Sequence, residues 1–519
     1  MKLVKILPDK IQIKTDDEEF KNSRLNDLVS VSDGEVELVT IITGITDNDV
    51  DEPIEDDTFL ADLKQPSLKM IECSILGSIM DKEFKQQIDK YPNTDVKIHK
   101  IYGNEFSSML FPNYTASFLL GNYAEYDTPA YIDGNKFYQR HSCIVGNTGC
   151  GKSETVTTIL EKTAAGTNCN IILFDIHGEY NSLSYVDNIK MGEVSFPIWM
   201  LGFSDMVTNI LKVKEDSVTV LSALRKAYYS CCHSGGNENK PLYFRFEDIM
   251  EYVKNLNEEK IEAGTYASGE KKGMIKTVNG DYYGKLSGII NIMEILYADR
   301  RYSFLFDDLG QQYLFDFLNR IMGGEKPVKN IDLSGIPHDI AVLIIGAITK
   351  LVYNIQIMQK DGEIRPITIV CDEAHVYIPV DFQLSASQRR MVEIFENIAK
   401  EGRKFGITLF VASQRPSELN KTIMAQCANY IVMKLNNEND KTMIKGMMPE
   451  GSSGVIESTT MFSPGDCLVI GDACPIPLKI HVKLAKERPQ SKTISFWDEW
   501  KIRKENVDYA GYLKEYLEN

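Results

Sequence analysis

Two short stretches of the sequence contain residues that could bind and cleave a nucleoside triphosphate, and the first is GNTGCGKS at 146–153. Gly146, Gly151, Lys152 and Ser153 match the pattern G-x-x-x-x-G-K-S, in which glycines let the backbone turn its N–H groups toward phosphate oxygens. We expect Lys152 to reach the β- and γ-phosphates and Ser153 to bind Mg²⁺. The predicted ATP-binding segment also contains Asn147, Thr148, Gly149, Cys150 and Glu154.

The residues around this loop predict the strand and the helix that the motif requires. SCIVG is a short apolar run typical of a buried strand, and ETVTTILEKTAA after the loop has the pattern of a helix. The amino end of a helix favours negative charge. A glycine-rich turn that matched the motif by accident would not need this context, so a nucleotide site is the favoured interpretation.

The second stretch, RPITIVCDEAH, is an apolar run that ends in Asp372 and Glu373. This order places one carboxylate near the Mg²⁺ shell and the next beside the attacking water. Asp372 is therefore the predicted metal-side residue, and Glu373 is the candidate general base. The letters DEAH also fit a helicase box, but those helicases place the box much nearer the phosphate loop and follow it with an arginine-glycine-rich motif. We predict instead one RecA-like domain whose sheet is interrupted by an insertion.

Two further segments could complete the site. SASQRRMVEIFENIAKEGRKFG has apolar residues at helical spacing, and Arg403 falls about 120° away from the first of them, outside the apolar stripe. GITLFVASQRP predicts another buried strand that ends in Ser413 and Gln414. A glutamine at that position can report whether the γ-phosphate is present. Arg403 as a surface residue near a helix end, and Gln414 as a turn residue, are equally compatible with the spacing.

Length, charge and cysteine usage limit the class of protein. The chain has 519 residues, and roughly 100–200 residues per domain indicates about three domains. A net charge of −17 argues against a protein that coats nucleic acid broadly, although it leaves room for a small basic patch. The opening MKLVKILPDK has no leader pattern, and the longest apolar run, IAVLIIGAI, is shorter than a membrane span. We expect a cytoplasmic protein without membrane segments, whose ten cysteines are reduced and mostly buried.

The predicted secondary structure changes several times along the chain. The first 110 or so residues predict β-strands, interrupted by the acidic stretch DNDVDEPIEDD, which we interpret as a solvated loop. Strand and helix patterns alternate from about 130 to 200 and again in the last third. Between them, LSALRKAYYS and IINIMEILYADRR have helical periodicity, and CHSGGNENK and ASGEKKG read as surface loops.

The combination of RHSCIVGNTGCGKS, ILFDIHGEYN, IVCDEAHVYIP, EGRKFGI and SQRPSEL resembles the HerA branch of the HerA/FtsK ATPases over nearly the whole chain. The resemblance implies an α/β fold with a RecA-like P-loop ATPase core, an inserted helical subdomain and an N-terminal small β-barrel. The expected segments are the barrel at 1–110, the first part of the core at 111–205, the insertion at 206–330, the second part of the core at 331–485 and a C-terminal tail at 486–519.

The same resemblance implies roles for individual residues. Arg403 would be an arginine finger donated into the site of a neighbouring subunit, and Arg140 would lie at that interface. Gln414 would be the sensor, and Asp175, at the end of a predicted strand, would support the nucleotide site. Ile176 departs from the family, which commonly has proline there. ATP and Mg²⁺ are the implied cofactors.

The family also implies six subunits in a ring with double-stranded DNA in the central channel. We expect a DNA translocase that works with an effector, a nuclease or a sirtuin-like NAD-consuming enzyme docked at the barrel, in antiphage defence. Alternatives are a DNA end-processing motor with a NurA-type nuclease, an assembly platform that does not translocate, and a conjugation or secretion ATPase. Lys271, Lys272 and Lys276 are weak candidates for DNA contacts, and the aromatic-rich tail predicts packing on a neighbouring subunit or on its own domain.

Overall fold

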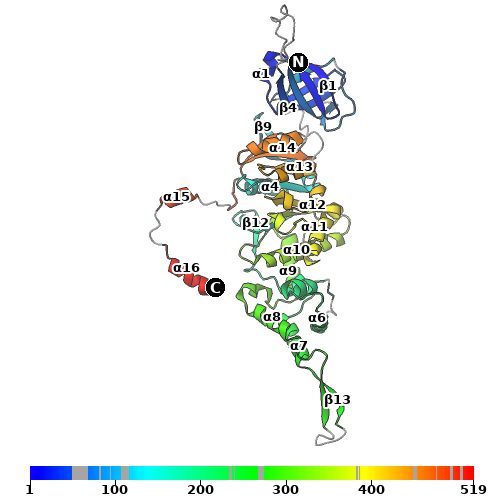
Figure 1. The fold of residues 1–519 in the computed structure, drawn as a ribbon, viewed down its shortest axis with the longest axis vertical. Helices are drawn as coiled ribbons and strands as arrows, with labels where there is room; N and C mark the ends of the chain where they lie inside the picture. Colours follow the sequence, from blue (N-terminus) through cyan, green and yellow to red (C-terminus); the bar gives the residue numbers. More distant parts are fainter. Residues whose placement is uncertain are drawn as a thin grey trace, which may run out of the picture. The chain divides into compact units, whose positions relative to one another are not determined.

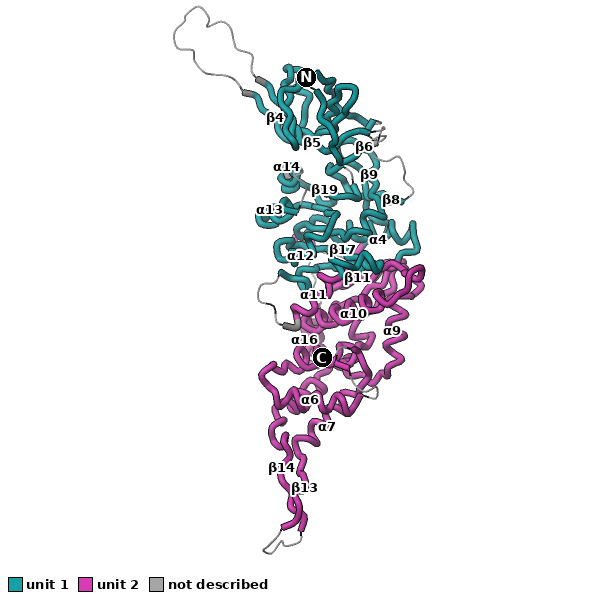
Figure 2. Tube along the Cα trace, turned by 90° about the vertical axis from the view of Figure 1, so that its right-hand side faces the viewer, with its two compact units in different colours: residues 1–169, 368–380, 398–488 teal, residues 170–367, 381–397, 489–519 magenta. Residues whose placement is uncertain are grey.

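A computed structural model of the chain describes residues 1–48, 68–80, 83–93, 95–103, 105–106, 116–232, 237–238, 240–266, 274–380, 384, 386–447, 453–474, 476–490, 495–502 and 507–518. The chain folds into two compact units (Figure 2). Unit 1 contains residues 1–169, 368–380 and 398–488, and unit 2 contains residues 170–367, 381–397 and 489–519. Most of the acidic stretch predicted as a solvated loop, and both Lys271 and Lys272, lie outside the described residues.

The N-terminal part of unit 1 is an antiparallel sheet with the strand order β1-β2-β5-β4-β3-β7, and β6 pairs with β5. Alternate residues such as Ile11, Ile13, Val29 and Val31 point into one apolar cluster, because side chains along a strand alternate between faces. The β-rich prediction is thus confirmed, whereas closure of the sheet into a barrel remains a prediction. The elements are β1 (Lys2–Ile6), β2 (Lys10–Lys14), α1 (Asp17–Asn22), β3 (Leu28–Ser32), β4 (Glu37–Asn48), β5 (Leu68–Met80), β6 (Glu83–Lys85) and β7 (Lys97–Lys100).

The rest of unit 1 is built on a mixed set of strands in the order β16-β17-β10-β18-β19-β20-β8-β9. β10 pairs in parallel with β17 and β18, and the pairs from β18 to β9 are antiparallel. The parallel register brings the ends of β10, β17 and β18 to one edge of the sheet, where ligands of open α/β sheets commonly bind. The strands are β8 (Ser117–Tyr123), β9 (Thr128–Asp133), β10 (Ser142–Val145), β16 (Ile367–Cys371), β17 (Ile407–Ser413), β18 (Asn429–Val432), β19 (Asp466–Gly471) and β20 (Lys479–Val482).

The helices of unit 1 include the one predicted to follow the phosphate loop. This helix, α4 (Lys152–Gly166), begins at the motif lysine, and its apolar residues Val156, Ile159 and Leu160 are buried. The other helical segments are α3 (Gly134–Gln139), η5 (Ala374–Val376), η6 (Gly402–Phe405), η7 (Pro416–Glu418), α12 (Lys421–Gln426), α13 (Glu438–Gly446), α14 (Ser453–Glu457) and η8 (Ser458–Met461).

Unit 2 contains three parallel strands, β11 (Ile171–Asp175), β12 (Val186–Lys190) and β15 (Val328–Asp332), in the order β12-β15-β11. Its helices confirm the helical periodicity of LSALRKAYYS and IINIMEILYADRR. They are η2 (Ile198–Leu201), α5 (Phe203–Asp205), η3 (Met206–Ile210), α6 (Val218–Cys231), α7 (Phe246–Glu258), α8 (Ser287–Ala298), η4 (Arg300–Leu305), α9 (Gln311–Gly323), α10 (His338–Met358), α11 (Ala386–Glu401, whose last turn belongs to unit 1), α15 (Phe496–Lys501) and α16 (Tyr509–Glu518).

An antiparallel hairpin that the sequence did not predict lies between α7 and α8. Its strands, β13 (Lys260–Thr265) and β14 (Ile275–Asn279), are exposed along their whole length and extend away from the two helices (Figure 1). Lys276, the described member of the lysine cluster, lies on β14. The predicted insertion is therefore not wholly helical, and its status as a separate subdomain remains a prediction.

Helix α10 corrects the expectation about apolar length. Its 21 residues have a mean hydropathy of 1.8 in the most apolar window, enough by length and composition to cross a membrane, and 56% of that window is buried inside the protein. Its buried face includes Ile344, Ile345 and Val352, and Gly346 packs against Met391 of α11. One half-buried helix of this kind is also what the core of a water-soluble protein contains.

Two other expectations can be compared with the structure. All ten cysteines are free thiols, and eight of them are buried, as expected.

The C-terminal tail does not bury its aromatic residues on its own chain: Trp497 and Trp500 are each 73% exposed and Tyr516 is 78% exposed. Packing of the tail on a neighbouring subunit remains a prediction, as does packing on its own domain.

Candidate nucleotide site

The phosphate loop connects the end of β10 to the start of α4, as predicted. Gly149 and Gly151 have φ angles of 77° and 96°, a region that favours glycine. At Gly146 the space is closed by neighbours, because an added Cβ would lie 2.7 Å from Cys150 Sγ and from Met433 Cβ. These features explain the glycines of the motif, Gly146 and Gly151, and also favour glycine at position 149.

The loop is held by backbone hydrogen bonds to the neighbouring strands. Gly146 N–H donates to the Ser413 carbonyl at 3.3 Å, and Asn147 N–H donates to the Lys434 carbonyl at 2.9 Å. On the other side, Gly465 N–H donates to the Cys150 carbonyl at 2.9 Å. The loop is therefore positioned by residues that are far away in the sequence, and Lys434 and Gly465 are contacts that no local motif indicates.

The predicted acidic pair follows β16 and meets the motif lysine. Lys152 Nζ lies 3.3 Å from Asp372 Oδ1 and also donates a hydrogen bond to Glu373 Oε1, and all three side chains are buried. Residues 220 positions apart thus form one ionic cluster. A buried charge is costly unless it is paired, so the cluster neutralises groups that the fold has removed from water.

Charge pairing determines the protonation of this cluster. Burial by itself would raise the pKa of Glu373, but the charge and hydrogen bond of Lys152 outweigh it, and the pKa of Glu373 is lowered. Burial likewise opposes the charged form of Lys152, while Asp372 and Glu373 raise its pKa above the ordinary value. Glu373 is therefore an ionised carboxylate, the form that a general base requires.

Glu373 also has an unusual backbone and an unsatisfied oxygen. Its φ of 45° is in the left-handed region, which costs a residue with a side chain about 1–3 kcal/mol and is commonly found at functional sites. Its buried Oε2 atom makes no hydrogen bond with a described residue, although His375 Nδ1 lies 3.3 Å from it. This oxygen therefore keeps the capacity to accept a proton, which fits a general base.

Gln414 links this carboxylate to the phosphate loop. Its Nε2 donates to Glu373 Oε1 at 2.5 Å, and its Oε1 accepts a hydrogen bond from Thr148 Oγ1. The parallel register places Ser413 beside Val145, so Gln414 follows its strand where the loop begins. The structure thus brings together Thr148, Lys152, Glu373 and Gln414, whereas the sequence could only place each of them after a strand.

His375 is a site residue that the sequence reasoning did not identify. Its Nδ1 lies 3.3 Å from Glu373 Oε2 and 3.3 Å from Ser413 Oγ. Burial lowers the pKa of His375 despite the opposing charge of Glu373. Its place in DEAH, two residues after the candidate base, was the available signal.

Ser153 and Glu154 occupy the first turn of α4 and are half-buried. Glu154 Oε2 is buried and makes no hydrogen bond with any residue that the structure describes. The lysine, the hydroxyl and amide groups, the carboxylates and the glycine loop together form the donor and acceptor set that a nucleoside triphosphate with Mg²⁺ requires. The residues present therefore fit the predicted cofactors.

Asp175, in unit 2, has a different immediate task from the one predicted. Its Oδ1 accepts hydrogen bonds from the N–H groups of His177, Gly178 and Glu179, at 3.2, 2.7 and 3.1 Å, and its Oδ2 accepts one from Tyr180 at 3.1 Å. Asp175 therefore orders the turn after β11. Its contribution to nucleotide binding remains a prediction.

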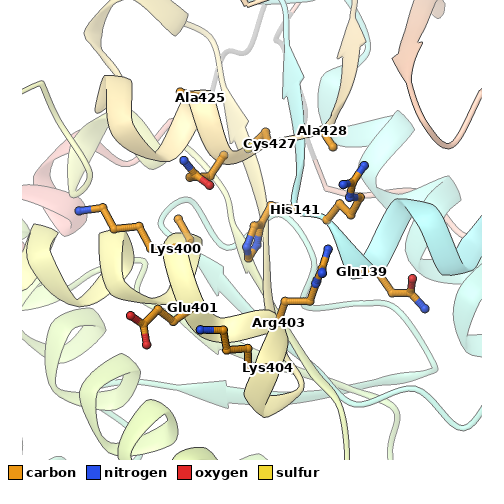
Figure 3. Close-up of a pocket in the computed structure, with 12 residues that line it drawn as sticks. Gln139, His141, Lys400, Glu401, Arg403, Lys404, Ala425, Cys427 and Ala428 are labelled. Atoms are coloured by element: carbon orange, nitrogen blue, oxygen red, sulfur yellow. The ribbon is translucent and has the colours of Figure 1, made fainter.

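A second feature of unit 1 is a pocket of about 380 Å³ that contains the two predicted arginines (Figure 3). Arg403, in η6, is exposed and makes no ion pair with any described residue, whereas Arg140 pairs with Asp472. The lining residues are Gln139, Arg140, His141, Ala399, Lys400, Glu401, Arg403, Lys404, Ala425, Gln426, Cys427 and Ala428. Four of these side chains are cationic, so the pocket can accept an anionic group.

The loop between a parallel strand and a helix, together with the buried lysine and carboxylates, defines a P-loop ATPase. Residues 118–352 match the family described as "Helicase HerA, central domain". The chain is 24% identical over 375 residues to "DNA double-strand break repair helicase HerA" of Sulfurisphaera tokodaii, covering 71% of this chain and 70% of that protein. It is 25% identical over 372 residues to the protein of the same name from Sulfolobus acidocaldarius, covering 70% and 69%.

Among solved structures, VirB4 of Thermoanaerobacter pseudethanolicus is similar with a TM-score of 0.49 and 15% identity, over 72% of this chain and 98% of that one. The family match and the curated relatives agree on the kind of enzyme. The chain is similar to HerA proteins through residues 118–352 and through these relatives, and it is an ATP-binding and ATP-hydrolysing, helicase-like enzyme.

Proposed function

We propose that this protein is a ring-forming ATPase that translocates along double-stranded DNA and works with a separate effector protein. The observation that carries the catalytic part is the chain of contacts from the exposed Thr148 through Gln414 to the buried Glu373 and Lys152. The DNA part is supported by the two relatives whose names describe DNA double-strand break repair helicases.

The proposed chemistry assigns one task to each residue. Bound ATP and Mg²⁺ supply the γ-phosphoryl group and the charge that stabilises its transfer. Ser153 and Asp372 hold the metal side of the site. Lys152 moves its ammonium group from Glu373 to the phosphates, and Glu373 then accepts the proton of the attacking water at Oε2. Gln414, which contacts both Glu373 and the loop, senses the γ-phosphate.

The ring is supported by the pocket that contains Arg403. An exposed arginine without a partner among the described residues, surrounded by other cations, is suited to the triphosphate of a neighbouring subunit. Arg140 would contribute to the same interface after it releases Asp472. We infer that the ring is a hexamer and that the tail braces adjacent subunits, since its large aromatic residues are exposed on the single chain.

The effector and its setting complete the proposal. The effector would be a nuclease or an NAD-consuming enzyme docked on the N-terminal sheet, which the resemblance implies is a barrel, and the setting would be antiphage defence in the cytoplasm. A NurA-type nuclease in DNA end processing is the alternative partner. A platform that regulates its effector without moving along DNA is the alternative mechanism.

The test is the steady-state ATPase rate of the purified protein, measured alone and with long linear duplex DNA at low and physiological salt. We expect DNA to stimulate turnover, and the stimulation to weaken as salt rises, because contacts to the phosphate backbone release counterions. The Glu373→Gln protein is the control for contaminating ATPases. An unchanged rate at both salt concentrations would contradict DNA-driven translocation and favour the platform.

A further inference from the structure

His141 is a buried histidine that the nucleotide chemistry does not use. It directly precedes β10 and lines the pocket that contains Arg403, where its ring lies between Lys400 and Arg403 (Figure 3). Only 4% of the residue is exposed. Its φ of 53° is in the left-handed region, which is uncommon for residues other than glycine. The burial and the backbone conformation of His141 therefore need a structural explanation.

The imidazole of His141 has neighbours on two sides. Nδ1 accepts a hydrogen bond at 3.0 Å from the N–H of Leu409 in β17, so the proton of the neutral ring is on Nε2. The ring also lies by the backbone of Ala399, in the last turn of α11, which lines the same pocket. Burial, with a smaller contribution from the charge of Arg403, lowers the pKa of His141 to about 4, so the ring is neutral near pH 7.

The segment held in this way leads directly to Arg403. Ala399 lies four residues before Arg403, and Gly402 between them is so closely packed that an added Cβ would lie 2.6 Å from the Ile407 carbonyl oxygen. Gly406, with a φ of 68°, ends the short turn that carries the arginine. Leu409 follows on the far side of that turn. His141 thus hydrogen-bonds one end of the segment that presents Arg403 and lies by the other end.

The other side of His141 leads to the phosphate loop. Its backbone carbonyl and that of Arg140 both accept from Ala428 N–H, at 3.3 and 3.0 Å, just before β18 begins. From His141 the chain runs through the four residues of β10 directly to Gly146. The same residue is therefore tied to the strand that enters this subunit's own phosphate loop and to the turn that presents Arg403.

We propose that His141 is a positioning residue: by its hydrogen bond to Leu409 and its packing by Ala399 it aims the Arg403 turn and connects that turn to β10 and the phosphate loop. The inference rests on the proposed role of Arg403 as a finger for a neighbouring subunit. It differs from a purely structural role, because His141 then affects turnover through Arg403 alone and leaves nucleotide binding by its own subunit unchanged.

The experiment is a double-mutant cycle on the full-length protein, with turnover number and the affinity for a fluorescent ATP analogue as separate measurements. We expect His141→Ala to lower kcat by about 10²-fold, the loss that a small misplacement of a catalytic group produces. The affinity for the analogue should change by less than about threefold, well under the 1.4 kcal/mol that corresponds to tenfold. In the Arg403→Ala background, His141→Ala should cause no additional loss, because residues that act as a unit are not additive.

Two further variants keep the result interpretable. Asparagine tolerates positive φ and can accept the Leu409 N–H, so His141→Asn should retain thermal stability while kcat stays low, since the shorter side chain does not reach Ala399. His99→Ala, which removes an exposed imidazole from the N-terminal sheet, is the matched control and should behave like the wild type.

The outcomes separate the two proposals. Wild-type kcat in His141→Asn, or an equal loss from His141→Ala with and without Arg403, would overturn the positioning role. If Arg403→Ala itself turns over at the wild-type rate, the finger assignment fails, whatever His141 does.

Discussion

The phosphate-binding half and the arginine half of the proposed site differ in how far the chain itself satisfies them. Lys152, Asp372 and Glu373 are buried and mutually paired, and Gln414 joins them to Thr148. Arg403 is exposed, and none of the described residues pairs with its guanidinium. The first half is paired within one chain, whereas the second, in the role that we propose, acts on the triphosphate of a neighbouring subunit. Hydrolysis by a single subunit should therefore be poor.

Replacing Arg403 should produce the largest effect. We expect Arg403→Ala to leave ATP binding nearly intact and to lower kcat by about 10³-fold or more, as loss of an arginine finger does in other phosphoryl-transfer enzymes. Steady-state turnover and equilibrium binding of an ATP analogue measure the two effects. Arg301→Ala, which removes an exposed arginine paired with Asp299, is the matched control. Turnover at the wild-type rate by the Arg403→Ala protein would show that hydrolysis does not need this arginine.

Mixing two inactive proteins sharpens this prediction. An Arg403→Ala subunit retains an intact phosphate half, and a Lys152→Ala subunit retains an intact arginine. If the arginine acts on a neighbour, the mixture should recover a measurable fraction of the wild-type rate that neither protein has alone. A mixture that stays inactive although both proteins co-assemble would indicate that Arg403 acts within its own chain.

Glu373→Gln tests the proposed general base in the phosphate-binding half of the site. We expect turnover to fall by about 10²- to 10⁴-fold, the usual contribution of a general base, while ATP still binds and is retained. Retention is measured by separating protein-bound from free nucleotide after one binding cycle. Glu457→Gln, a change at an exposed carboxylate paired with Lys441 and Lys445, should turn over normally. Rapid hydrolysis by Glu373→Gln would place the base elsewhere.

Gln414 should have an intermediate effect, because it orients the base without accepting a proton. Loss of a hydrogen bond to a charged group costs about 1.5–3 kcal/mol, so Gln414→Ala should lower kcat by about 10- to 100-fold. Thr148→Val, which removes the other end of the contact, should lower it less. If Thr148→Val were inactive while Gln414→Ala hydrolysed normally, the link between loop and base would not be functional.

Deleting the tail after residue 495 should have the smallest effect on the single subunit. Since Trp497, Trp500 and Tyr516 are exposed on the chain, their loss should hardly change the melting temperature of the protomer. Light scattering should instead show smaller or more easily diluted assemblies. An intact assembly of unchanged mass at low concentration would contradict the brace.

Local patterns were enough to predict the elements that carry the chemistry. The apolar runs at 142–145, 367–371 and 407–413 are strands, and the segment after the phosphate loop is a helix. Residues at their ends could therefore be assigned to a nucleotide site. The hairpin of β13 and β14 was missed because its strands lie outside any core, so they carry no buried apolar alternation. The apolar length of α10 was underestimated because polar residues interrupt the run within one continuous helix.

The sequence by itself determined which groups are available: a glycine-rich loop with a lysine, two carboxylates after a strand, and a glutamine after another. Only the tertiary structure decided which of these groups meet. Strand register sets Ser413 beside Val145, and this brings Gln414 to Glu373 and Thr148. The hydrogen bond between His141 and Leu409, and the place of His141 by Ala399 in the same pocket, were likewise invisible in the sequence. Periodicity reports burial within an element, whereas contacts between elements depend on their pairing and packing, which no local pattern encodes.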